Sequence, residues 1–443
     1  MVAQNKFLEK QIHKNITQIK KGGIEVIIKK TISIIKFFFQ IPIYFLSIPI
    51  IIFFYIIKPF YLIRWRAIYS SRIGHLAKET ELFCCAEDLK INYPKQKYLN
   101  IFFLITPYIS NKQLLKMWKR KLIILPSFLM LPLYRISNFI SKYVPKFEDH
   151  HIKPIAKDTM RDVLNILEKT KPHLEFNEKE KFLGKETIKK FGLNENDKFV
   201  CLIVRDQGYL SKKSPHRDWS YQEYRNSNIE NFLLCAEELT KRGYYVFRMG
   251  THTEKKFTSD NKMIIDYSNS ELRSDFMDIY LGANCEFCIS TATGFDEVPI
   301  IFRKPIAYTG VVPVGCLETH NKQTLLIFKE HFSETFKKKL SIKEILNLKL
   351  GIIYKKEEYK NKNIKLIENT AEQIKDLVVE MDERLNGRWI ESEEAKKLQT
   401  IFWHNYSSNQ EFNNYQKNNS KMHGEIKSKI SSKFLIENQY LVE

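Results

Sequence analysis

The segment Cys288–Pro299, CISTATGFDEVP, holds the densest group of residues with a chemistry to offer. It is predicted to be a strand end, a small-residue turn and a short helix that opens with two acids. The candidate phosphate ligands are Ser290, Thr291, Thr293 and Gly294. Hydroxyls, a closely approachable backbone and the free N–H groups of a helix start all suit an anion, whereas Asp296 and Glu297 suit sugar or ribose hydroxyls. The competing interpretation is an ordinary helix N-terminus with a threonine cap.

Two arginines end predicted strands in the same half of the chain. Arg205 closes one strand and Arg248 another, with Gly250 directly after it. Because the carboxyl ends of parallel strands share one edge of a sheet, both guanidiniums are predicted to lie beside Ser290. There they could bind a diphosphate in fork geometry. Two solvated strand ends are the alternative.

The loop SPHRDWSYQEYRN, at 214–226, lies between these two strands. It is dense in aromatic, basic and amide side chains, and loops of this length usually have a task. Arg225 and Asn226 are its candidates for the same binding site. An exposed turn without a binding role is the alternative.

An Arg-Ile-Gly-His sequence at 72–75 is the main candidate site of the first half of the chain. It is predicted to join a strand to a helix, so that Arg72 and Gly74 face a substrate. His75 titrates near neutrality and could act as a general base. Glu79 and Glu81, on the next turn, could orient it or act in its place, and Glu81 is the second catalytic candidate. A helix cap or a structural imidazole is the alternative for His75.

Several familiar sites are disfavoured because their patterns do not occur. The chain has no GxxxxGK[ST] loop, no GxGxxG fingerprint and no GxSxG elbow. Its one CxxC, at 285–288, lies on a predicted strand without a second pair, so a zinc site is not expected. No cofactor and no obligatory metal are predicted.

The elements that would position these residues alternate between strands and helices. In the second half, apolar strands at 198–205, 244–249, 263–266, 286–290 and 305–309 are separated by helical patterns such as 228–242 and 274–282. The first half repeats the alternation, with strands at 64–69, 98–106 and 121–125. The predicted fold class is therefore α/β, with two facing Rossmann-like domains.

Charge and hydropathy single out the start of the chain. Of the net charge of +20, half lies in residues 1–75, which contain twelve Lys/Arg and two acids. Within them, Phe37–Ile57 is an uncharged run of 21 residues, close to the ~20 that span a bilayer as a helix. With its basic flanks it is predicted to be a membrane anchor, either spanning or, because of Pro42 and Pro49, bent and re-entrant. A buried core helix is the alternative.

Nucleic acid is the other common partner of so basic a chain. The charge gathers around an apolar run rather than around stacking aromatics, and no nucleic-acid motif occurs, so this partner is not expected. Seven cysteines without regular spacing argue against a disulfide scaffold. The segment from Asn405 onward is rich in Asn, Ser, Lys and Gln and is expected to be partly disordered.

Several segments together resemble bacterial glycosyltransferases of the two-Rossmann-domain GT-B type, and in particular those of cell-surface polysaccharide clusters. The matching segments are RIGHL at 72–76 with Thr80-Glu81, Tyr224-Arg225-Asn226, GYYVFRMG at 243–250, DFMDIYLGANCEFCISTATGFDEVP at 275–299 and KPIAYTG at 304–310. The long run is also similar in layout to heptosyltransferases. The resemblance covers roughly residues 64–320.

The apolar run at the start of the chain and the resemblance together predict a division of the chain into four parts. The expected parts are a membrane-anchoring segment at 1–63, an N-terminal acceptor domain at 64–190, a C-terminal nucleotide-sugar domain at 191–365, and helices with a polar tail at 366–443. The resemblance implies transfer of a sugar from a nucleotide-sugar co-substrate to a lipid-linked or surface-glycan acceptor, without a metal. Because sugar nucleotides are cytosolic, the enzyme is expected at the cytoplasmic face of the bacterial inner membrane.

Two other functions stay open at this stage. One is a non-catalytic, membrane-attached scaffold that binds a nucleotide or a glycan. The other is an acyl- or phosphoryltransferase with a phosphorylated donor. The stereochemistry is also open, because a retaining reaction would leave His75 only a role in positioning the acceptor.

Overall fold

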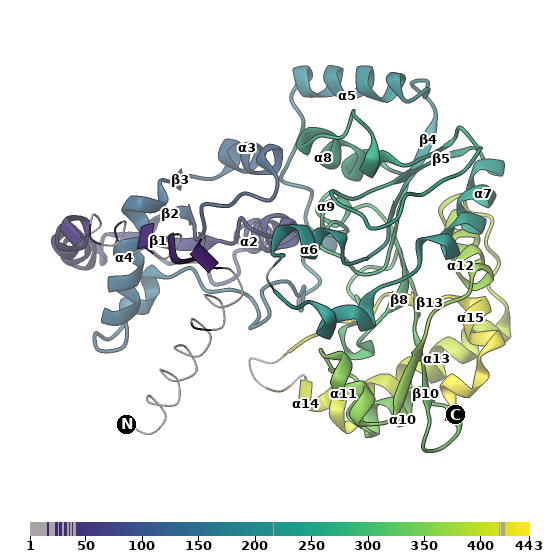
Figure 1. The fold of residues 1–443 in the computed structure, drawn as a ribbon. Helices are drawn as coiled ribbons and strands as arrows, with labels where there is room; N and C mark the ends of the chain where they lie inside the picture. The colour runs from purple at the N-terminus through teal and green to yellow at the C-terminus, as the bar shows by residue number, and fades with distance from the viewer. Residues whose placement is uncertain are drawn as a thin grey trace.

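The computed structural model describes residues 41–443, apart from 216, 416 and 418–420, together with scattered residues between 16 and 38. Two parallel sheets, each flanked by helices, organise the described chain (Figure 1). A third, small antiparallel sheet joins β10 (Glu330–Ser333), β11 (Lys338–Lys339) and β12 (Ile364–Ile367). The prediction of an α/β fold with parallel sheets is confirmed.

The first sheet has three strands in the order β1-β2-β3: Tyr61–Ile68, Lys97–Leu104 and Ile124–Leu125. Its crossover helices are α2 (Thr80–Asp88) and α3 (Lys112–Lys121), and α4 (Ser127–Ile140) follows the last strand. Because the strand order runs in one direction only, the sheet corresponds to one half of a doubly wound sheet. The three predicted strands and the parallel sheet of the first half of the chain are therefore confirmed.

The second sheet has seven parallel strands in the order β13-β9-β8-β7-β4-β5-β6. Their bounds are β4 Lys198–Ile203, β5 Tyr244–Arg248, β6 Ile264–Ile265, β7 Cys288–Ser290, β8 Ile306–Val311, β9 Thr324–Phe328 and β13 Lys429–Ile430. If β4 to β9 are numbered 1 to 6 along the chain, their order across the sheet, read from β6 to β9, is 3-2-1-4-5-6, which is the doubly wound order. The order reverses between β4 and β7, which are direct neighbours.

Helices cover both faces of this sheet and bury a single large core. They are α5 Glu178–Lys190, α7 Leu233–Lys241, α8 Asp275–Asn284, α9 Glu297–Ile301, α10 Ile342–Asn347, α11 Lys356–Asn361, α12 Ala371–Leu385, α13 Glu393–Ser407, α14 Gln410–Tyr415 and α15 Ser432–Glu437. The short helix α6, Gly208–Lys213, has no buried residue. Figure 1 shows α2 between the two sheets, and Leu82 and Cys85 on this helix belong to the core of the second one.

The end of the chain is more ordered than its composition suggests. β13 adds to the outer edge of the seven-stranded sheet by pairing with β9, and the side chains of Phe434 and Leu435 on α15 are buried. The expectation of disorder is therefore wrong for residues 421–443. Polar residues dominate the sequence there, but the few apolar ones are spaced to reach the core.

Part of the expected membrane anchor at 37–57 lies outside the described residues. Within it, residues 41–57 form a helix. Ile51 and Phe54 of this helix pack on Trp65 and the first sheet, while Phe45 and Ile56 are about two-thirds exposed. Among the residues that the structure describes, no helix is both long enough and apolar enough to cross a membrane.

Candidate functional site

The reversal of strand order places two sequence-predicted residues side by side. In open α/β sheets, ligands bind outside the carboxyl ends of the strands where the order reverses. Arg205 follows β4, and the turn 291–296 follows β7. The backbone N–H of Arg205 donates to the Thr291 hydroxyl at 2.8 Å, which ties the two strand ends together. The predicted sheet edge and the turn are thus brought together.

The turn after β7 is held by its own side chains. The Asp296 carboxylate accepts hydrogen bonds from the Ser290 hydroxyl at 2.9 Å and from the Thr293 backbone N–H at 3.1 Å. Ala292 adopts a left-handed conformation with φ of 57°, and its N–H donates to Ser290. Ser290 and Asp296 are fully buried and shape the turn. The prediction that their side chains bind the ligand is therefore wrong. Gly294 is exposed.

Two neighbouring arginines contact this turn, Arg225 through its guanidinium and Arg205 through its backbone N–H. Arg225 donates to the Ala292 carbonyl at 2.6 Å, and Arg205 donates from Nη2 to the Gln222 side chain at 2.6 Å. The Nε of Arg205 is buried without a hydrogen-bond partner. Burial and the neighbouring charge of Arg225 lower the pKa of Arg205 to about 10. Neither arginine forms an ion pair with a carboxylate in the described chain, so the pair is set up to receive an anion.

Asn226 directly follows Arg225 in the same loop. Its backbone carbonyl accepts a hydrogen bond from the Lys329 ammonium, whose own pKa is lowered by burial. This contact anchors the loop to the second domain beside the arginine pair. A direct role of the Asn226 side chain in binding stays a prediction.

Arg248 does not join this pair, contrary to the sequence prediction. Its side chain is 1% exposed, and its guanidinium lies 3.5 Å from both Asp206 and Asp266 and donates to the Ser268 hydroxyl at 2.6 Å. Two carboxylates thus neutralise it within the second domain. Gly250 has a φ of 147°, and a Cβ there would lie 2.9 Å from the Thr253 side chain, so it serves a tight turn.

The 72–75 loop of the first domain meets the turn across the domain boundary. A Cβ on Gly74 would lie 3.2 Å from the Gly294 carbonyl and from the Glu297 side chain, so a larger residue would have to push the turn back by a few tenths of an ångström. Arg72 is exposed at the same junction. Next to it, Lys213 of α6 donates to the Ser71 carbonyl at 2.5 Å, which links the two domains again. The predicted opposition of loop and turn is present.

His75 begins a π-helical turn, His75–Glu79, that leads into α2. Its Nδ1 lies 3.1 Å from Oε2 of Glu79, whose other oxygen accepts from Arg66 at 2.6 Å. Although burial opposes it, the hydrogen bond from His75 and the charge of Arg66 lower the pKa of Glu79. A charged Glu79 therefore orients the imidazole through Nδ1. The spacing i, i+4 could have identified this pair.

Glu81, the second catalytic candidate, is a structural anchor instead. It is fully buried, and its Oε1 lies 2.6 Å from Arg303 and 3.0 Å from His173. Hydrogen bonds to Cys85 and Glu81 outweigh burial and raise the pKa of His173 to about 10. The prediction of a catalytic role for Glu81 is wrong because its charge is already satisfied between the two domains.

The same residues form the one potential metal cluster of the described chain. Ligand atoms of Glu81, Cys85 and His173 lie within 4.8 Å of one another. The guanidinium of Arg303, however, already contacts two of these ligand atoms, Glu81 Oε1 at 2.6 Å and Cys85 Sγ at 3.6 Å, and His173 contacts carboxylates through both ring nitrogens. An ion-pair cluster explains these contacts better than a metal site does.

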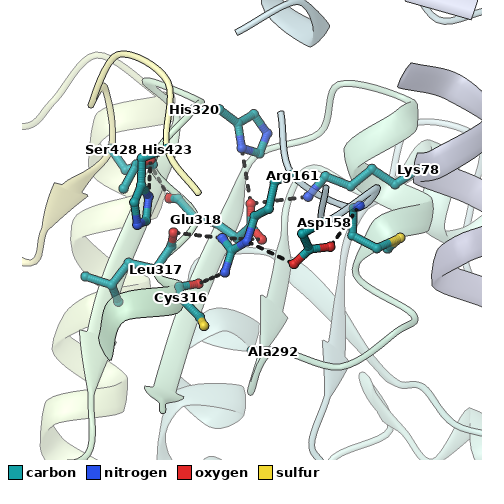
Figure 2. A network of polar contacts seen from close by, with 12 residues as sticks. Lys78, Asp158, Arg161, Ala292, Cys316, Leu317, Glu318, His320, His423 and Ser428 are labelled. Atoms are coloured by element: carbon teal, nitrogen blue, oxygen red, sulfur yellow. Dashed lines mark hydrogen bonds and ion pairs between the residues drawn. The ribbon is translucent and has the colours of Figure 1, made fainter. Parts of the chain in front are cut away.

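A buried network that the sequence did not reveal lies behind the turn (Figure 2). Lys78 of the first domain is completely buried, with its ammonium 3.2 Å from both Glu297 and Glu318. Arg161 lies 3.3 Å from Glu318, and His320 lies 3.2 Å from it. Glu297, predicted as a ligand, is thus part of the network that joins the domains. No local motif marks this network, since its members lie up to 242 residues apart.

Glu297 should make the stability of the protein depend on pH. Burial, reinforced by Asp296 and opposed by Lys78, raises its pKa to about 8. The proton on Glu297 therefore favours the folded state fully below its ordinary pKa of about 4.5, and this contribution is lost as the pH rises through 8. We expect the melting temperature to fall between pH 5 and pH 8, and to fall less in Glu297→Gln. If differential scanning fluorimetry gives the same dependence of melting temperature on pH for the wild type and Glu297→Gln, this assignment is contradicted.

Comparisons with known proteins leave the family open. No family model matches the chain, and no curated protein matches it. Among solved structures, it is similar to E. coli ADP-heptose LPS heptosyltransferase II, at 12% identity and a TM-score of 0.33, over 57% of this chain and 86% of that one. A glycosyl transferase family 9 structure from Veillonella parvula matches at 11% identity and a TM-score of 0.33, over 56% and 79%. At such TM-scores, no conclusion about this chain rests on either likeness.

Proposed function

We propose that this protein is a glycosyltransferase that moves a sugar from a nucleotide-sugar donor to an acceptor bound by the first domain. The observation that carries the proposal is the Arg205–Arg225 pair where the strand order reverses: the Arg225 guanidinium and the Arg205 backbone N–H both contact the 291–296 turn. Two guanidiniums without carboxylate partners suit the diphosphate of such a donor. The 72–75 loop contacts the turn through Gly74, and His75 is the next residue along the chain.

The proposed reaction uses these groups without a metal. The oxygen of the acceptor hydroxyl attacks the anomeric carbon while His75 Nε2 takes the proton of that hydroxyl. Glu79 stabilises the imidazolium that forms. The bond between the anomeric carbon and the diphosphate oxygen breaks, and the electron pair leaves with the diphosphate. Arg205 and Arg225 then stabilise the negative charge of the leaving group.

Donor binding tests the proposal directly. In Arg225→Ala, the affinity for nucleoside diphosphates should fall by about 10–100-fold, because a charged hydrogen-bond donor to the ligand is lost. Arg217→Ala is a matched control, since this exposed arginine of the same loop stacks on Trp219 at 4.2 Å. Isothermal titration with UDP, GDP, ADP and CMP, and then with the corresponding sugar nucleotides, measures the effect.

The outcomes separate the alternatives. If no nucleotide binds to the folded wild-type protein, a scaffold without turnover is favoured and the proposal fails. If nucleotides bind equally well to wild type and Arg225→Ala, the site lies elsewhere. Binding together with sugar release to water in the absence of an acceptor would support the proposal.

We also propose that the protein acts on the cytoplasmic face of a membrane, on a lipid-linked or surface-glycan acceptor of bacterial polysaccharide synthesis. The support is an apolar surface on the first domain, made by the helix at 41–57 and by α4. Its exposed side chains include Phe45, Leu46, Phe53, Ile56, Phe128, Leu129 and Phe139. Arg135 of α4 donates to the Tyr44 hydroxyl at 2.6 Å and holds the two helices together. The basic start of the chain complements anionic lipid.

Two aspartates in this surface should weaken lipid binding. In Phe128→Asp/Phe139→Asp, the affinity for vesicles that contain phosphatidylglycerol should fall by about tenfold or more per residue, because each phenylalanine loses its burial in the interface. Phe182→Asp is the control, since Phe182 on α5 is 68% exposed but lies outside this surface. Vesicle co-sedimentation measures the change, and equal sedimentation of all three proteins would reject this surface.

A further inference from the structure

A cavity of about 390 Å³ lies in the first domain, between β1, α2 and the segment at 149–161. It does not include the Arg205–Arg225 pair, and its volume is in the range of small-molecule sites. Leu62, Phe83 and Ile152 supply apolar wall, while guanidinium, carboxylate and amide groups supply the rest. So mixed a lining calls for a ligand with both polar and apolar faces.

The charges that line this cavity cancel one another. Arg64 lies 2.9 Å from Glu87, and Arg66 lies 2.6 Å from Glu79, so two pairs of lining residues neutralise each other. Two further lining charges have partners just outside the cavity, in the pairs Arg161–Glu318 and Asp149–Lys58.

The remaining titratable groups do not change this balance. His151 is neutral at physiological pH, because burial lowers its pKa to about 4. Lys153 lies at the exposed rim. The cavity thus differs in kind from the arginine pair of the second domain, where no carboxylate of the described chain forms an ion pair.

Paired charges still form hydrogen bonds. Guanidinium and carboxylate groups held in pairs keep spare donors and acceptors, which a ligand rich in hydroxyls can use without bringing a charge of its own. Asn92 and Gln96 add amide groups. Tyr93, 47% exposed and packed edge-to-face on Tyr98 at 5.1 Å, offers an open aromatic face for the C–H side of a sugar ring.

The cavity is also linked to the proposed base. Glu79 lines it with one side and contacts His75 through Oε2. A small recess around His75 shares Arg66, Glu79 and Phe83 with the cavity. A ligand in the cavity can therefore contact Glu79, the residue that orients His75.

We infer that this cavity binds an uncharged glycan. Its service as the acceptor site rests on the proposed function, whereas the binding itself does not. The phosphate or lipid portion of an acceptor would then lie outside the cavity, and the sugar inside it.

Glycan binding without donor tests this inference. Saturation-transfer NMR on the full chain would use a panel of uncharged p-nitrophenyl hexosides and the corresponding hexose 6-phosphates. We expect at least one uncharged glycoside to bind, and to bind more tightly than its phosphorylated counterpart. Tyr93→Ala should lower that affinity by about tenfold, because an aromatic contact to the sugar is lost. Tyr143→Ala, an exposed tyrosine outside the cavity, should leave it unchanged.

The remaining results would overturn the inference: no binding by any panel member, tighter binding of the phosphates, or equal affinity in both tyrosine variants. Arg225→Ala separates the two proposals, because it should spare glycan binding. Glycan binding without any nucleotide binding would reject the transferase and keep the cavity. If nucleotides bind but no glycan does, the cavity proposal is rejected and the transferase proposal is kept.

Discussion

In His75→Gln, the turnover number for sugar transfer should fall by about 10²–10⁴-fold, with the donor affinity unchanged. Glutamine keeps a hydrogen bond to Glu79 within reach but cannot take a proton from an acceptor hydroxyl. The imidazole is oriented by the contact of Nδ1 with Glu79 Oε2 at 3.1 Å, and it packs on the Tyr69 ring with a centroid distance of 5.6 Å. Steady-state kinetics with a saturating sugar nucleotide gives kcat, and titration of the same nucleotide gives the affinity.

His404→Gln is the matched control, since His404 is an exposed histidine on α13. The kcat of Glu79→Gln should lie between those of His75→Gln and His404→Gln, because this variant weakens the orientation of the imidazole without removing it. If His75→Gln keeps the wild-type kcat, then no general base acts at this position, and a retaining reaction with His75 as a positioning residue is favoured. If kcat and donor affinity fall together, the variant has disturbed the domain junction instead.

Arg248→Ala should lower the free energy of unfolding by about 3–5 kcal/mol, because it leaves two carboxylates without their buried counterion. Asp206 and Asp266 each lie 3.5 Å from this guanidinium, whose pKa burial lowers despite both acids. Urea denaturation followed by tryptophan fluorescence measures the loss. Should the variant fold too poorly to study, Asp266→Asn tests the same pair more gently.

The donor affinity of Arg248→Ala distinguishes its two interpretations. A structural role predicts that the folded fraction at low temperature still binds nucleotide like the wild type. A variant with wild-type stability and no nucleotide binding would restore Arg248 to the diphosphate site and contradict the ion pairs described above.

The strands and their shared edge could be predicted from sequence, because buried parallel strands are continuous apolar runs. The sequence therefore placed Arg205 and the 290–294 turn at the same edge of the sheet, as the structure does. The choice between arginines could not be predicted: Arg248 ends its strand just as Arg205 does, but two acids 42 and 18 residues away neutralise it.

The role of Glu81 likewise depends on residues that are distant in sequence. Glu79 and Glu81 both follow His75 closely, but only the spacing of four residues places a carboxylate on the same helix face. Glu81 turns toward Arg303, which is distant in sequence. Lys78 with Glu318, and Asp149 with Lys58, are likewise tertiary pairs without a local signature.

The position of β13 has a consequence for biosynthesis. About a hundred residues separate β9 from this last strand, which pairs with it at Leu325 and Leu326. While the ribosome still holds the C-terminus, the hydrogen-bonding edge of β9 stays uncovered, and such an edge invites association between nascent chains. Premature termination near residue 420 would make that exposure permanent, so prematurely terminated chains should partition into inclusion bodies while the full chain matures.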